Sequence, residues 1–147
     1  MTKNPDKELL LKFMEDPSAP VDVDSNPLAK ALRCRFLEAD PSGQVRLEFE
    51  PDETFIQGGN AVQGGAVAAM LDFAMAYAGL AALPAEQSAA TVSMTVNYLK
   101  PVQAGRYEAV GALERKGRTL LFASSELRAL DGDVLVANAT SVLAVLP

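Results

Sequence analysis

One acidic residue, Asp72, lies near the middle of an apolar stretch that runs from residue 66 to residue 83. Burying an ionised carboxylate costs free energy unless a partner or a hydrogen bond compensates for it. Asp72 is therefore expected to reach solvent, to meet a partner, or to line a functional cavity. A carboxylate in a cavity can act as a general base or as a nucleophile. The competing interpretation is a structural Asp at a seam between two subunits.

Two glycines, Gly64 and Gly65, open the same stretch. Backbone N–H groups at a helix start have no intrahelical acceptor and lie at the positive end of the helix dipole, so they can bind a developing oxyanion. Without Asp72 the pair would indicate an ordinary turn before a helix. Gly64 and Asp72 lie about 12 Å apart along a helix axis, too far to serve one carbonyl easily from one chain. Two such helices packed antiparallel about a two-fold axis would bring Gly64 of one subunit toward Asp72 of the other, which predicts a homodimer.

Composition excludes several kinds of chemistry. The chain has no histidine, so Ser-His-Asp triads, Cys-His pairs and His-ligated zinc are impossible, and we expect neither a metal nor an organic cofactor. Gly59 and Gly64 have the outer spacing of a P-loop, but Gly65 stands where that motif needs Lys. The formal net charge of −6 opposes binding to nucleic acid.

Hydrophobic periodicity predicts the elements that must position these residues. A chain of 147 residues is expected to form one core. The predicted order is an amphipathic helix, an exposed connection, two strands, one long helix and several long strands. The corresponding ranges are 5–16, 17–27, 32–36, 45–50, 64–83, 92–98, 105–115, 118–130 and 133–146. This order predicts an α+β fold with an antiparallel sheet packed on one central helix, in which residues 1–26 form a helix and linker and residues 27–147 form the domain.

The long apolar stretch also raises the question of a transmembrane span. Its central Asp72 and its preference for Ala over Leu or Ile favour a buried helix of a globular protein instead. Cys34 is the single cysteine, and the N-terminal residues lack the apolar core of a signal peptide. We therefore expect a cytoplasmic protein that does not act at a membrane.

Three motifs carry a resemblance to a known family. They are N-A-V-Q-G-G-A-V-A-A-M-L-D-F-A, T-V-S-M-T-V-N-Y-L-K-P and K-G-R. Together they resemble the hotdog-fold acyl-CoA thioesterases of the phenylacetate-degradation type, over roughly residues 30–146. The resemblance implies a hotdog fold, an acyl-CoA substrate, and a homodimer or a dimer of dimers.

The resemblance also implies roles for single residues. Asp72 would activate water or attack the thioester carbonyl, and the backbone N–H of Gly64 would polarise the carbonyl oxygen. Thr91 would help to place the water, and Gln57 would contact the reaction centre, where the family often has Asn. Residues expected to bind substrate are Gln63, Gly65, Asn60, Arg115, Lys116 and Arg118.

Gln63 stands where the family usually has His, and it can donate a hydrogen bond but cannot titrate. Arg115, Lys116 and Arg118 form a basic run that is more often a solvated turn, although it can hold CoA phosphates.

Two alternatives to hydrolysis follow from the same residues. A hotdog protein that only binds acyl-CoA, as a sensor or carrier partner, has no need of a costly acid such as Asp72. A hotdog hydratase resembling this family uses an Asp and His pair, which a chain without histidine lacks.

Overall fold

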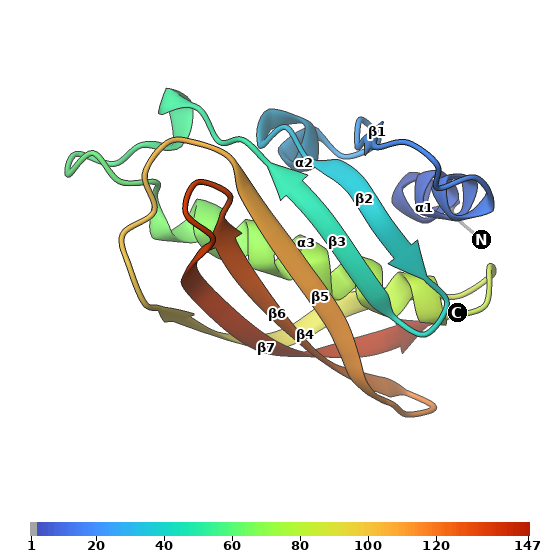
Figure 1. The fold of residues 1–147 in the computed structure, drawn as a ribbon. Helices are drawn as coiled ribbons and strands as arrows, with labels where there is room; N and C mark the ends of the chain where they lie inside the picture. The colour runs from blue at the N-terminus through green and yellow to red at the C-terminus, as the bar shows by residue number, and fades with distance from the viewer. Residues whose placement is uncertain (1–2) are drawn as a thin grey trace.

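A curved antiparallel sheet of seven strands wraps around one long helix, as the computed structural model of the chain shows for residues 3–147 (Figure 1). The elements are α1 (Pro5–Glu15), β1 (Val21–Asp22), α2 (Pro27–Ala31), β2 (Arg35–Asp40), β3 (Gln44–Phe49), the 3₁₀ helix η1 (Glu53–Phe55), α3 (Gly64–Ala82), β4 (Ser88–Tyr98), β5 (Tyr107–Lys116), β6 (Leu120–Ala129) and β7 (Val134–Leu146). The predicted α+β architecture with one central helix is confirmed.

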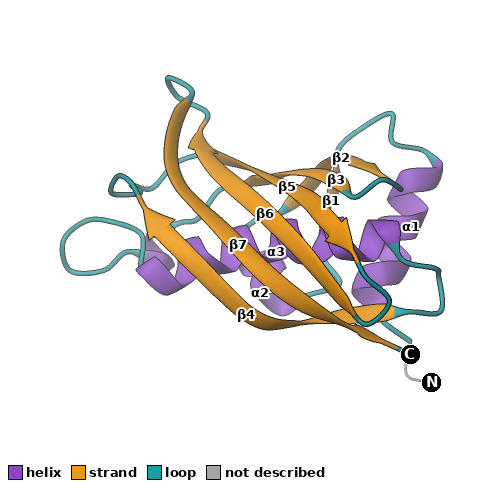
Figure 2. Ribbon diagram, turned by 90° about the horizontal axis from the view of Figure 1, so that it is seen from below, coloured by secondary structure: helices purple, strands orange, loops and turns teal. Residues whose placement is uncertain are grey.

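The sheet has the order β1-β2-β3-β5-β6-β7-β4. Strand β4 follows α3 in the chain but lies at the far edge, where it pairs with β7 alone (Figure 2). Its register with β7 shifts between Thr91 and Ser93, which marks a β-bulge. One side of β4 therefore presents unpaired backbone groups along its whole length.

Helix α3 forms because its sequence is rich in Ala, Leu and Met and has Val67 as its one β-branched residue. Leu83 leaves the helical conformation, since Pro84 disfavours helix in the residue before it. Gly111 on β5 lets the helix approach the sheet, because a Cβ there would lie 2.1 Å from the carbonyl oxygen of Ala74. The helix is long and apolar enough to cross a membrane, yet 61% of its apolar window is buried inside the fold.

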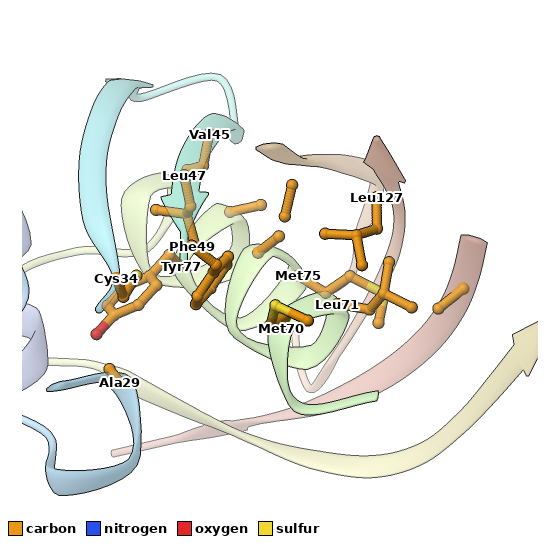
Figure 3. Packing of buried hydrophobic residues seen from close by; sticks show 14 of the residues in the cluster. Ala29, Cys34, Val45, Leu47, Phe49, Met70, Leu71, Met75, Tyr77 and Leu127 are labelled. Carbon is orange, nitrogen blue, oxygen red and sulfur yellow. The ribbon is translucent and has the colours of Figure 1, made fainter. Parts of the chain in front are cut away.

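The core lies between α3 and the inner face of the sheet. Met70, Leu71 and Met75 of α3, Leu127 of β6 and Leu47 of β3 belong to this core, and Figure 3 shows Leu71 and Met75 beside Leu127. All five side chains are fully buried.

Helix α1 extends this core at the other end of α3. Leu10 and Phe13 of α1 are buried, and the Phe13 ring stacks on Phe36 with centroids 5.3 Å apart. Phe36 in turn meets Tyr77 of α3 edge to face. The amphipathic helix predicted at the N-terminus is therefore present and packs through its apolar side.

Residues 17–36 differ from the prediction. The expected exposed connection contains β1, and Val23 beside it is buried at 1% exposure. Leu32 ends α2 and Arg33 has a φ of 54°, so the strand predicted from residue 32 begins at Arg35. Leu32, Cys34 and Phe36 are all buried, but Leu32 caps α2 whereas Phe36 lies on β2. Their alternation therefore does not mark one continuous strand.

Candidate active site

Asp72 and Thr91 form a hydrogen-bonded pair between α3 and β4. Asp72 belongs to a half-buried stripe of α3 that also contains Ala68, Ala69, Phe73 and Ala76. Thr91 lies on the exposed edge strand, beside its bulge. Its hydroxyl donates to Oδ1 of Asp72 over 2.7 Å. Among residues 3–147 no donor contacts Oδ2, which leaves that oxygen available to a water or a substrate.

The start of α3 presents two free N–H groups. Ala66 and Val67 donate their N–H groups to the carbonyl of Gln63, over 2.9 and 3.1 Å. Within the described part of the chain nothing accepts from the N–H of Gly64 or Gly65. A helix start with free N–H donors can bind a negatively charged group or stabilise a developing oxyanion.

Tyr98 holds the first peptide group of the helix. Its hydroxyl donates to the carbonyl oxygen of Gly64 over 2.7 Å, and a Cβ on Gly64 would lie 3.4 Å from that hydroxyl. Tyr98 is 53% exposed. This exposure follows from the place of β4 at the edge of the sheet. Tyr98 is the last residue of β4. Its place in the sequence does not show that the strand lies at the edge of the sheet.

The loop before α3 contains Gln57, Asn60 and Gln63. The Gln57 side chain accepts a hydrogen bond from the N–H of Gly59 over 3.2 Å. Asn60 has a φ of 61°, which asparagine tolerates in a turn. Gln63 binds the carbonyl of Phe55 through its N–H over 2.6 Å, while its side chain is exposed and makes no capping hydrogen bond.

The basic run lies at the opposite end of α3. Lys116 donates through Nζ to the carbonyl of Ala82 over 2.7 Å, so it stabilises the C-terminus of the helix. The hairpin between β5 and β6 that carries Arg115, Lys116 and Arg118 lies far from Gly64 (Figure 1). One chain therefore does not bring the basic run to the free N–H groups.

Two hollows reach the first turn of α3. The first, which we call the Gly64 hollow, has a volume of about 380 Å³ and is lined by Gly64, Val67, Tyr98, Lys100 and Gln57 among others. The second, the Gly65 hollow, has a volume of about 410 Å³ and lies between α2, η1 and α3. Its lining includes Leu28, Phe55, Ile56, Gly65 and Ala69.

One chain thus brings together two separate groups of the expected residues. Asp72 meets Thr91, whereas Gly64 and Gln57 line one hollow and Gly65 and Gln63 line the other. Gly64 and Asp72 lie at different turns of α3, about 12 Å apart along the helix axis, so the two groups remain apart within one subunit. This arrangement can supply a carboxylate with one free oxygen and, at a distance, a set of oxyanion donors.

Comparisons with known proteins identify the family of the chain. Residues 59–136 match the pattern of the thioesterase superfamily. No curated protein sequence gives a significant match.

Among solved structures, a phenylacetic acid degradation-related protein from Ralstonia eutropha is 30% identical, with a TM-score of 0.79 over 96% of this chain and 99% of that chain. A thioesterase family protein from Silicibacter pomeroyi is 28% identical, with a TM-score of 0.77 over 82% of this chain and 90% of that chain. The E. coli PaaI protein, from the phenylacetic acid degradation operon, shares the fold, with 20% identity and a TM-score of 0.76 over 83% and 86% of the two chains.

Proposed function

This chain belongs to the thioesterase superfamily, and we propose that it hydrolyses an acyl-CoA thioester to a free carboxylic acid and CoA. The observation that carries the proposal is the hydrogen-bonded pair of Asp72, on the half-buried stripe of α3, and Thr91, on β4. A carboxylate on an apolar helix is costly to keep unless it serves a purpose, and here one of its oxygens remains free.

Two routes are compatible with one carboxylate. As a general base, Asp72 takes a proton from water, and the resulting hydroxide attacks the thioester carbon. As a nucleophile, Asp72 attacks that carbon itself, and water later hydrolyses the mixed anhydride. Both routes form a tetrahedral oxyanion that the N–H of Gly64 would stabilise. The carbon–sulfur bond then breaks, and the CoA thiolate leaves and takes up a proton.

The active unit that we propose is a homodimer joined through β4 and α3. Strand β4 has no charged residue, no proline and an unpaired edge, whereas edge strands of monomers are usually protected by such residues. The stripe of α3 beside it carries Ala68 and Ala76, small residues that allow a second helix to approach closely. A two-fold axis here would pair β4 with its own copy and bring Gly64 toward the partner's Asp72. The same axis would carry the basic hairpin of one subunit toward the helix start of the other.

We also propose that two dimers can assemble into a tetramer and that the protein is cytoplasmic. Arg and Glu side chains of the neighbouring strands β2, β3 and β5 form ion pairs, as between Arg46 and Glu38 at 2.6 Å and between Arg46 and Glu108 at 3.4 Å, and such a charged surface is compatible with a second dimer. Cys34 is free and buried, which fits a reducing compartment.

The substitution Asp72→Asn tests the proposal, because the amide keeps the shape of the side chain and removes its basic oxygen. We expect kcat for acyl-CoA hydrolysis to fall about 10²- to 10⁴-fold, with the dimer and acyl-CoA binding retained. The melting temperature should stay constant or rise, since a costly carboxylate has been removed. Release of free thiol from a panel of acyl-CoAs measures the rate. Burial raises the pKa of the Cys34 thiol, so the folded protein adds no background to that assay.

Asp131→Asn is the matched control, because Asp131 lies in an exposed turn away from α3. A wild-type hydrolysis rate in Asp72→Asn would refute the catalytic assignment. Dissociation or early melting of this variant would indicate a structural Asp at the subunit seam. Binding of acyl-CoA by the wild-type chain without thiol release from any member of the panel would favour a sensor or carrier partner.

A further inference from the structure

The two hollows lie on different sides of the same helix start. The Gly64 hollow is formed with the end of β4 and the loop that follows it, whereas the Gly65 hollow is formed with α2 and η1. In a thioester two arms, the acyl group and the thiol group, extend from one carbonyl. A carbonyl held at the first turn of α3 would therefore send one arm toward each hollow.

Charge distinguishes the two hollows. The lining of the Gly64 hollow includes Lys100, and no acidic residue accompanies it there. The lining of the Gly65 hollow has no charged residue at all, and Leu28, Phe55, Ile56 and Ala69 make most of it apolar. An anionic nucleotide arm is suited to the hollow with the lysine, and an apolar arm to the other.

The walls of the Gly65 hollow are held by specific contacts. The carbonyl of Phe55 in η1 accepts the N–H of Gln63, over 2.6 Å, which fixes η1 against the helix start. Asn26 caps α2 by accepting the N–H groups of Leu28 and Ala29. The Asn26 side chain also donates to Asp6 of α1 over 3.1 Å, so α2 is tied to the body of the fold. The hollow is thus formed before any ligand enters.

We propose that the Gly65 hollow receives the acyl arm of the substrate, that this arm is apolar and uncharged, and that Leu28 on α2 selects it. The inference rests on the proposed thioester hydrolysis and specifies its substrate class. Leu28 is 44% exposed, although it is a large apolar residue, and it faces the space that the acyl arm would fill. A terminal carboxylate in this hollow would lose water and find no cationic partner, which disfavours dicarboxylic acyl groups.

Hexanoyl-CoA and adipoyl-CoA test this proposal, because they have acyl chains of equal length and differ in one terminal carboxylate. For the wild-type chain we expect kcat/KM for hexanoyl-CoA to exceed that for adipoyl-CoA by at least about 100-fold. Leu28→Lys introduces a cation into the hollow and should lower this ratio about 10-fold or more. Thr54→Lys, at an exposed position of the same wall, should act in the same direction and replaces the first variant if that one fails to fold.

Leu130→Lys is the matched control, since Leu130 is 39% exposed in the turn after β6 and lines neither hollow. Its ratio should equal that of the wild-type chain. Equal ratios in all variants would overturn the proposal. A fall in oligomer mass for Leu28→Lys with an unchanged ratio would also overturn it, because the partner subunit would then fill the hollow.

Binding separates a failure of this inference from a failure of the proposed reaction. If the wild-type chain hydrolyses neither thioester, the proposed function fails, and calorimetric affinities for the two CoA esters still test the hollow. If it hydrolyses both, the affinities are measured on Asp72→Asn. Tighter binding of hexanoyl-CoA, reduced by Leu28→Lys, supports the assignment, and equal affinities contradict it.

Discussion

At the scale of single residues, the hydrogen bond from Thr91 to Asp72 decides how the carboxylate is presented. The bond occupies Oδ1 and restricts the rotation of the Asp72 side chain. Thr91 thereby also sets the orientation of Oδ2. A hydrogen bond to a charged group contributes about 1.5–3 kcal/mol. Thr91 is therefore expected to act on Asp72 as a positioning residue.

Thr91→Val removes the hydroxyl and keeps the branched shape. We expect kcat to fall roughly 10- to 100-fold with little change in KM, because the bond orients the reacting group and not the substrate. Steady-state kinetics of thioester hydrolysis measure both constants. Thr140→Val on the neighbouring strand β7 makes the same change at an exposed position away from Asp72 and should keep the wild-type kcat. A Thr91→Val enzyme with unchanged kcat would remove Thr91 from the site.

The sequence indicated Asp72 because an acid interrupts an apolar helix, and it indicated Gly64 because a glycine pair opens that helix. It did not indicate Tyr98, whose contact with Gly64 depends on the place of β4 in the sheet. Edge position follows from long-range pairing and is not encoded in local alternation. The apolar wall at Leu28 was also missed, because it comes from a helix of five residues that has too few turns to show a period.

At the scale of elements, lysines stabilise the C-terminal end of α3. Lys7 of α1 is 2% exposed and donates through Nζ to the carbonyls of Leu83, Pro84 and Gln87, over 3.1, 2.7 and 2.9 Å. These are all three donors that an ammonium group has. Lys116 binds the carbonyl of Ala82 at the same end. The helix that carries Asp72 is thereby fixed by α1 and β5 together.

Lys7→Met tests this fixation by keeping the length of the side chain and removing its donors. Carbonyl groups left without partners at a buried helix end should cost about 1–3 kcal/mol. For a chain of this size the melting temperature should fall by about 2–4 °C for each kcal/mol. Thermal unfolding followed by circular dichroism measures the change. Lys12→Met, at an exposed position of the same helix, should shift the transition much less. Equal shifts in the two variants would contradict the capping role of Lys7.

Long elements with strong periodicity were predicted well, and short ones were not. Helix α3 and strands β5 to β7 have enough residues for a clear pattern. Strand β4 begins at Ser88, earlier than predicted, since Ser88, Ala89 and Ala90 are small and do not alternate. Strand β1 has two residues and forms only because β2 lies beside it. Tertiary pairing determines such elements, and one sequence does not display it.

At the scale of the whole molecule, the exposed edge of β4 is the surface that the proposed dimer would bury. Val92 is 61% exposed on this edge, and the strand carries no charge. In a monomer a lysine at such a position would change the stability by no more than about 0.5 kcal/mol. At a subunit seam the same lysine would lie buried against a second copy of an apolar strand.

We therefore expect Val92→Lys to halve the molecular mass in light scattering, and to abolish hydrolysis because each site loses the groups of its partner. Circular dichroism should show a folded chain. The control Leu130→Lys adds the same charge at an exposed position in a turn and should keep both mass and activity. A dimeric, active Val92→Lys protein would exclude β4 as the seam.

The uncharged edge of β4 also has a consequence for the newly synthesised chain. Until it meets a second copy, the chain exposes eleven residues of strand without a charge or a proline, which is the kind of segment that recruits other unpaired strands into aggregates. Solubility in the cell should then depend on how quickly two chains meet. Substitutions that weaken the seam without adding a charge are expected in the insoluble fraction, whereas an added lysine protects the open edge and keeps the single chain in solution.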